Sequence, residues 1–149
     1  MSNSTAPPRI AGLSALAANY PVILSDVWGV VHNGVRAFAE AGAALARHRA
    51  AGGVVILITN APRLAPHIVA QLDQLGVDRA AYDDIVTSGD VTRELLARRH
   101  GAKVLHIGTK VHLPLYEGLD LSLVSGDDAD IISCTGLRDD EHESPDASD

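Results

Sequence analysis

Short runs of aliphatic residues that alternate with helix-like stretches constrain the fold of this chain more than any other feature. The clearest run is Val54-Val55-Ile56-Leu57-Ile58, and a similar run ends in a carboxylate, Val22-Ile23-Leu24-Ser25-Asp26. Continuous aliphatic runs of this length are typical of strands that are buried on both faces, as in a parallel sheet. The pattern therefore predicts an α/β fold built on parallel strands.

The expected elements follow this alternation along the chain. Beyond the two runs above, strands are expected at residues 84–87, 103–107, 121–124 and 130–134. Helices are expected at residues 9–19, 38–51, 64–75, 91–99 and 111–117. Residues 1–8 and the acidic residues 138–149 lack apolar periodicity and are expected to be disordered, which leaves residues 9–137 as the folded part.

Composition narrows the classes of function. The 149 residues carry a net charge of −7, which argues against a nucleic-acid-binding protein. Cys134 is the single cysteine, so no intrachain disulfide can form and a reducing compartment is expected. No aliphatic run reaches the roughly 18 residues of a membrane span, and residues 1–8 do not have the pattern of a secretory signal. We therefore predict a cytoplasmic protein with no membrane partner.

Asp26 is the first candidate functional residue, because it stands where an apolar strand should end. In open parallel sheets, ligands bind beyond the carboxyl ends of the strands. A carboxylate at this point can act as a nucleophile or as a ligand of Mg²⁺. It can equally cap the polar turn that follows, which contains His32, Asn33 and Gly34.

A second polar segment, residues 59–63, follows the run that ends at Ile58. The hydroxyl of Thr59 and the amide of Asn60 suit a phosphate at a strand's carboxyl end, and a helix is expected just beyond. Either residue can instead be the N-cap of that helix. Arg63 could reach the same phosphate or be a structural surface arginine.

Four more polar residues have competing interpretations. Ser88 and Asp90 follow a third expected strand and are candidates for the rim of the site, although a helix cap is the simpler explanation of Asp90. His106, inside an apolar strand, is expected to be a hydrogen-bonded core histidine. Cys134 is expected to be a buried, inert thiol. The histidines show no metal-ligand spacing, so no zinc site is expected.

The segment Asp26-Val27-Trp28-Gly29-Val30-Val31 resembles motif I of the haloacid dehalogenase superfamily, D-x-D-G-[VT]-[LV]. The version with tryptophan, which continues into His32-Asn33-Gly34, is similar to one subfamily of its class IIA members, relatives of the nucleotide and sugar phosphatases. Thr59 and Asn60 match motif II of the same superfamily. The resemblance implies a Rossmann-like, three-layer, doubly wound parallel sheet, and Mg²⁺-dependent phosphoryl transfer from a small phosphorylated metabolite.

The resemblance also implies roles for single residues. In this family the first aspartate of motif I attacks phosphorus and forms an aspartyl-phosphate, and Asp26 matches it. The second aspartate protonates the leaving group, and its carbonyl helps to hold Mg²⁺. Trp28 stands at that position, so its carbonyl can serve the metal while its indole cannot shuttle a proton at neutral pH. The implied site comprises Asp26 as catalytic residue, Asp26 and Trp28 as metal ligands, and Thr59, Asn60, Arg63 and Ser88 as substrate-binding candidates.

The resemblance covers nearly the whole chain, but only about the first half of a full family member. No lysine follows Lys110, and the later Gly-Asp motif of the family is absent. Motifs III and IV are therefore missing, as is the cap domain, which would begin within residues 138–149. We expect little or no turnover from these 149 residues alone, and self-association through the incomplete sheet.

Three hypotheses remain open at this point. The chain is the N-terminal part of a phosphatase of this superfamily, or a non-catalytic relative that binds a phosphorylated ligand or a partner chain. The third hypothesis is an unrelated doubly wound domain, such as a flavodoxin-like nucleotide binder. No glycine-rich phosphate loop follows any expected strand, which argues against the third.

Overall fold

The computed structural model describes residues 9–137, in which strands and helices alternate as the sequence predicts. The strands are β1 (Val22–Asp26), β2 (Val54–Thr59), β3 (Asp84–Thr87), β4 (Ala102–Ile107), β5 (Leu121–Val124) and β6 (Ile131–Cys134). The helices are α1 (Ser14–Ala17), α2 (Ala39–Ala50), α3 (Ala65–Gln74) and α4 (Ser88–Ala97), with the 3₁₀ helices η1 (Arg79–Ala81) and η2 (Lys110–Leu115). The predictions for residues 1–8 and 138–149 lie outside the described residues.

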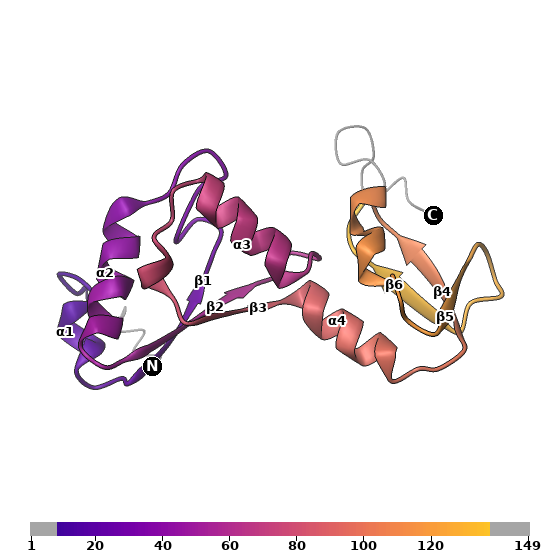
Figure 1. Cartoon of the computed structure of the whole chain (residues 1–149), viewed down its shortest axis with the longest axis horizontal. Coiled ribbons are helices and arrows are strands. Elements are labelled where there is room, and N and C mark those ends of the chain that lie inside the picture. Colours follow the sequence, from indigo (N-terminus) through magenta and orange to yellow (C-terminus); the bar gives the residue numbers. More distant parts are fainter. Residues whose placement is uncertain (1–8, 138–149) are drawn as a thin grey trace, which may run out of the picture. The chain divides into compact units, whose positions relative to one another are not determined.

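The first sheet has the strand order β1-β2-β3, and β1 pairs with β2 in parallel from Val22↔Val54 to Asp26↔Ile58 (Figure 1). On one face, Val55 and Leu57 are 0% exposed. On the other face, Leu24 is 64% exposed. The aliphatic runs are strands, as predicted, but the expectation that they are buried on both faces is wrong for this outer face of β1.

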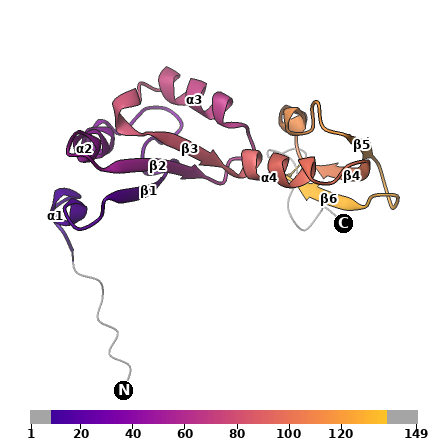
Figure 2. The same cartoon turned by 60° about the horizontal axis from the view of Figure 1, so that its bottom comes forward.

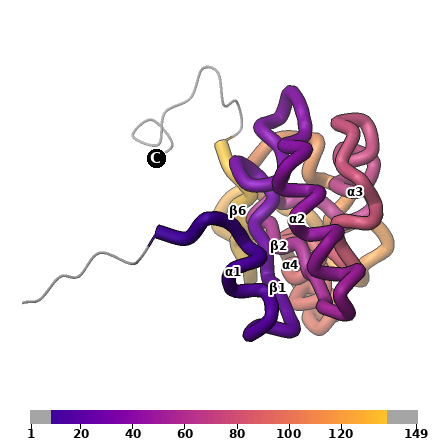
Figure 3. The backbone as a smooth tube through the Cα atoms, turned by 90° about the vertical axis from the view of Figure 1, so that its left-hand side faces the viewer, coloured from indigo at the N-terminus to yellow at the C-terminus, as the bar shows by residue number. Residues whose placement is uncertain are grey.

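Helix α2 ends where its sequence signals predict. Its last turn carries basic residues, and Gly52, just beyond the helix, has a φ of 91°, which only glycine adopts at little cost. A Cβ at Gly53 would lie 2.1 Å from Nε2 of His48, so the buried His48 ring would have to move to make room for it. The expected helix at residues 9–19 is reduced to the short α1, which lies beside α2 (Figure 3).

The second sheet has the order β5-β4-β6, with β4 in the middle and all pairs parallel (Figure 2). Val104 of β4 is 0% exposed and packs in a cluster with Leu96, Leu115 and Tyr116. The helix expected around Pro114 is the 3₁₀ helix η2, since proline removes a backbone donor that an α-helix needs. Both sheets are parallel, so the predicted α/β class is confirmed.

The described residues divide into two compact units. The first comprises residues 9–58 together with Leu72–Ile85, and the second comprises Thr59–Gln71 and residues 86–137. Across the described residues, none of the helices has both the length and the apolar character needed to span a membrane.

Candidate functional site

Asp26 is the last residue of β1, and its side chain is exposed, as expected at the carboxyl end of a strand. Its Oδ1 accepts a hydrogen bond from the Val27 N–H at 2.7 Å, which orients the carboxylate. Among the described residues, the other oxygen has no hydrogen-bond partner. One oxygen of Asp26 is therefore available to a ligand or an electrophile.

The loop after β1 folds back on itself and holds the next residues in place. The Val27 carbonyl accepts a hydrogen bond from the His32 N–H at 3.3 Å, and the Gly29 N–H donates to the His32 carbonyl at 2.8 Å. The Asn33 side chain accepts from the two amides at positions 35 and 36, at 3.0 Å each. Within the described part of the chain, no backbone amide donates to the Trp28 carbonyl, so this oxygen remains available.

Trp28 is 61% exposed, and its indole packs against the ring of His32. The two rings meet edge to face, with centroids 5.5 Å apart and planes at 83°. His32 is buried, and its Nδ1 accepts a hydrogen bond from the Gly34 N–H at 2.9 Å. Burial lowers the pKa of His32, which favours the neutral imidazole that this hydrogen bond requires.

The segment after β2 is tied to the start of α4. The Ser88 hydroxyl donates to the carbonyls of Asn60 at 2.8 Å and Ala61 at 3.0 Å, and the Gly89 N–H donates to the Ala61 carbonyl at 3.2 Å. A Cβ at Gly89 would lie 2.5 Å from the carbonyl oxygen of Arg63. The glycine therefore lets two segments of this chain approach each other.

Asp90 joins the starts of two helices. Its Oδ2 accepts from the Ala65 N–H at 2.9 Å and from the Thr87 hydroxyl at 2.7 Å. Thr87 is the N-cap of α4, and its Oγ1 accepts from the Asp90 N–H at 2.9 Å. Helix α4 thus begins three residues before the expected Val91, and Asp90 serves the first amide of α3 rather than capping α4. The Thr-x-x-Asp spacing is that of a capping box, and this signal in the sequence was missed.

The predicted substrate-binding residues lie together in the second unit, whereas Asp26 belongs to the first. The Thr59 oxygen accepts from the Ala61 N–H at 3.2 Å, within the loop, so Thr59 is not the N-cap of α3. Asn60 is exposed. Ser88 already donates its hydroxyl proton to two carbonyls, so in this arrangement it positions the loop.

Arg63 is half-buried, and its Nη1 lies 3.5 Å from Oε1 of Gln71, at the limit of a hydrogen bond. This contact is too weak to fix the guanidinium. The roles of Arg63 and of the other substrate-binding candidates stay predictions.

The structure tests the predictions for His106 and Cys134. His106 is hydrogen-bonded as expected, with Nε2 3.0 Å from the Thr135 hydroxyl, and its ring lies 5.3 Å from that of Tyr116. Cys134, expected to be buried, is exposed. Successive side chains of a strand point to opposite faces, and Ser133 occupies the inner face of β6, which turns Cys134 outward.

The oxygen atoms near Asp26 fit a hard divalent cation such as Mg²⁺, which prefers carboxylate and carbonyl ligands. The available Asp26 oxygen and the Trp28 carbonyl are ligands of this kind. In the described range 9–137, no group of three or more His, Cys, Asp or Glu side chains could hold a metal ion. A cation held by Asp26 and Trp28 would therefore keep several water ligands.

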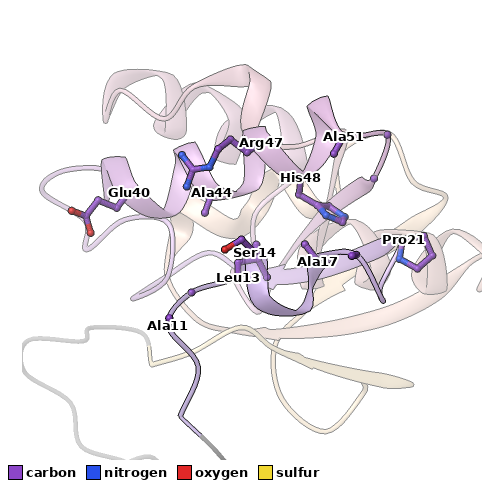
Figure 4. Close-up of a pocket in the computed structure, with 14 residues that line it drawn as sticks. Ala11, Leu13, Ser14, Ala17, Pro21, Glu40, Ala44, Arg47, His48 and Ala51 are labelled. Atoms are coloured by element: carbon purple, nitrogen blue, oxygen red, sulfur yellow. The ribbon is translucent and has the colours of Figure 1, made fainter.

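A separate hollow of about 700 Å³ lies between α1 and α2, lined by alanines, His48 and Arg47 (Figure 4). Pro21 and Gly53, which precede β1 and β2, place it at the amino ends of these strands. Asp26 stands at the opposite end of β1. The hollow contains none of the predicted site residues.

Comparison with known proteins relates the chain to one family. Residues 23–122 match the model of a haloacid dehalogenase-like hydrolase family. A solved structure of a hydrolase of the haloacid dehalogenase-like family from Brucella suis 1330 is 51% identical, with a TM-score of 0.84 over 94% of this chain and 52% of that chain. The chain thus spans about half the length of this relative. No curated protein matches the chain.

Two further structures resemble it less closely. A glycerol phosphate phosphatase from Mycobacterium tuberculosis, solved in complex with magnesium, is 28% identical, with a TM-score of 0.62 over 82% of this chain and 38% of that one. NagD from E. coli K-12 is 20% identical, with a TM-score of 0.59 over 77% of this chain and 46% of that chain, and supports the fold alone. The fold is therefore part of the Rossmann-like α/β core that these structures share.

Proposed function

Since this chain belongs to the haloacid dehalogenase-like hydrolase family, we propose that its protein is a Mg²⁺-dependent phosphatase that acts on a small phosphorylated metabolite through Asp26. The observation that carries the proposal is the exposed Asp26 carboxylate at the end of β1, with one oxygen oriented by Val27 and the other available. A relative that is a glycerol phosphate phosphatase in complex with magnesium supports both the substrate class and the cation.

The proposed chemistry has two steps at Asp26. The available oxygen attacks phosphorus, the bond between phosphorus and the ester oxygen breaks, and the alcohol leaves with a proton from water. Water then attacks the phosphorus of the aspartyl-phosphate, which releases inorganic phosphate and a proton and restores the carboxylate. Because Trp28 cannot donate a proton, we expect slow protonation of poor leaving groups.

Other residues are assigned to the phosphate and the cation. The Thr59 oxygen accepts from a loop amide, so its proton can be offered to a phosphoryl oxygen. Arg63 and Asn60 supply a cation and an amide on the same loop. Asp26 and the carbonyl of Trp28 would hold Mg²⁺, which supplies neutralising charge for the transferring phosphoryl group when bound.

The test is Mg²⁺-dependent phosphate release from p-nitrophenyl phosphate by the complete encoded protein, with Asp26→Asn and Asp84→Asn compared. Asp84 is a matched control, because its Oδ1 also accepts a 2.8 Å hydrogen bond from the next amide while it stands at the amino end of β3. We expect Asp26→Asn to abolish release and Asp84→Asn to retain it. Equal activity of both variants would refute the assignment of Asp26.

An alternative is a non-catalytic protein that binds a phosphorylated ligand or a partner chain. The observation that favours it is Trp28, which takes the place of the family's proton donor. Absence of phosphate release by the wild-type protein, with binding of a phosphate monoester retained in Asp26→Asn, would select this alternative.

We also propose that the 149-residue chain self-associates through the outer face of β1 and β2. Val22 is 52%, Leu24 64% and Val54 40% exposed on this face, and a parallel sheet normally has both faces covered. Sedimentation velocity tests this, and a monomer at high protein concentration would exclude it.

The single cysteine supports a cytoplasmic location, which cell fractionation can check.

A further inference from the structure

Trp28 combines exposure with a fixed position. It is the only tryptophan in the 149 residues, and it is 61% exposed. A single exposed apolar side chain is ordinary in itself. What sets this one apart is that its neighbours fix its orientation and that it stands two residues after Asp26.

The contacts that hold the indole are specific. The buried His32 meets it edge to face, an arrangement that aromatic pairs prefer. The His32 ring is in turn held by the Gly34 N–H, which donates to its Nδ1. A Cβ at Gly34 would lie 2.5 Å from Cη2 of Trp28, so the indole rests directly on the Gly34 backbone. Gly34 also has a φ of 84°, which other residues rarely adopt.

This arrangement presents a flat, apolar surface close to the nucleophile. The Cα atoms of Asp26 and Trp28 are at most about 7 Å apart. When a phosphate is bound at Asp26, an aromatic ring attached to its ester oxygen can therefore reach and stack on the indole of Trp28. Stacking on an aromatic side chain contributes roughly 1–3 kcal/mol for a nucleic-acid base. An acyclic polyol has no flat face and gains much less.

We propose that the Trp28 indole is the binding platform for the leaving group, and that the preferred substrates are phosphate monoesters whose leaving group carries an aromatic ring. This rests on the proposed phosphatase function of Asp26, and it adds a substrate class to that function. Trp28, which replaces the aspartate that donates a proton in the family, thereby also determines which phosphate esters are preferred. An aromatic alcohol is a more acidic leaving group than an aliphatic one and depends less on protonation, so the two consequences of Trp28 agree.

The test compares phenyl phosphate with glycerol 3-phosphate in the complete encoded protein. Binding is followed by tryptophan emission in the Asp26→Asn background, which prevents turnover, and KM and kcat are measured with Asp26 present. We expect phenyl phosphate to bind about tenfold more tightly and to quench the tryptophan emission, and we expect this quenching to be lost in Trp28→Phe. Trp28→Ala should raise the KM for phenyl phosphate about tenfold, and Trp28→Phe should restore most of the preference.

Tyr20→Ala is the control, because Tyr20 is an aromatic residue of similar exposure, 57%, outside this loop. It should leave both KM values unchanged. Hydrolysis of both esters with equal KM and no quenching would overturn the platform while the phosphatase function stands. Quenching by phenyl phosphate without hydrolysis in any form would support the platform and refute the phosphatase function. Loss of the preference in Trp28→Ala that Trp28→Phe does not restore would indicate a structural role and overturn the proposal.

Discussion

Replacement of Gly89 by alanine tests how the segment after β2 is held against α4. Gly89 is the second residue of α4, is buried and has an ordinary helical backbone, so alanine introduces no backbone strain there. The new Cβ would lie 2.5 Å from the oxygen, 2.6 Å from the carbon and 2.7 Å from the nitrogen of Arg63. These are backbone atoms, which cannot rotate away as a side chain can. The helix start and the Arg63 segment must therefore separate.

The magnitude follows from the contacts that this separation breaks. They are the Ser88 hydroxyl to the loop carbonyls at 2.8 and 3.0 Å, the Gly89 N–H to Ala61 at 3.2 Å, and the Ala65 N–H to Asp90 at 2.9 Å. The Ser88 hydroxyl has one proton and counts once, so three donors lose their partners at about 1 kcal/mol each, roughly 3 kcal/mol in total. Alanine regains about 1 kcal/mol over glycine in a helix. We therefore expect a net destabilisation of about 2 kcal/mol.

The assay is urea unfolding of the chain, followed by far-ultraviolet circular dichroism. Gly42→Ala is the matched control, because Gly42 is also a buried helical glycine, but a Cβ there would have no atom within 4 Å beyond its chain neighbours and the backbone of its own helix. Gly42→Ala should stabilise the protein by about 0.5–1 kcal/mol through helix propensity alone. If Gly89→Ala is as stable as Gly42→Ala, the close approach to Arg63 does not restrain the loop and the reasoning is wrong.

Three further predictions concern other parts of the chain. Thr87→Ala should destabilise the protein by about 1–2 kcal/mol through loss of the α4 cap, whereas Thr87→Ser, which retains the hydroxyl, should cost much less in the same urea assay. Because burial lowers the pKa of His32, its contribution to stability is fully present above pH about 6.5 and is lost as the pH falls through the lowered pKa. Unfolding midpoints measured between pH 7.5 and 5 should therefore fall less in His32→Gln than in the wild type, and parallel curves would contradict this. Leu24→Lys on the outer face of β1 should reduce self-association in sedimentation velocity, while Val35→Lys, in an exposed loop, should not.

The sequence alone determined where the strands lie. Aliphatic runs that end in polar turns identified β1, β3 and β5 to the residue, because burial in a sheet requires such runs and the turn residues interrupt them. It also identified the end of α2, since basic residues followed by glycine act locally on the last helical turn. The resemblance to one family rested on short segments of the same kind, and the family match bears it out.

The tertiary structure decided what the polar residues near the strand ends do. The sequence indicates Ser88 as a site residue, yet its hydroxyl donates to the carbonyls of Asn60 and Ala61, which lie more than 25 positions earlier in the chain. The exposure of the outer face of β1 and of Cys134 could not be predicted from the sequence either. Local patterns report the preferences of neighbouring residues for helix, strand or turn. Whether a hydroxyl proton is engaged or an apolar face is covered depends on segments distant in sequence, which no local pattern encodes.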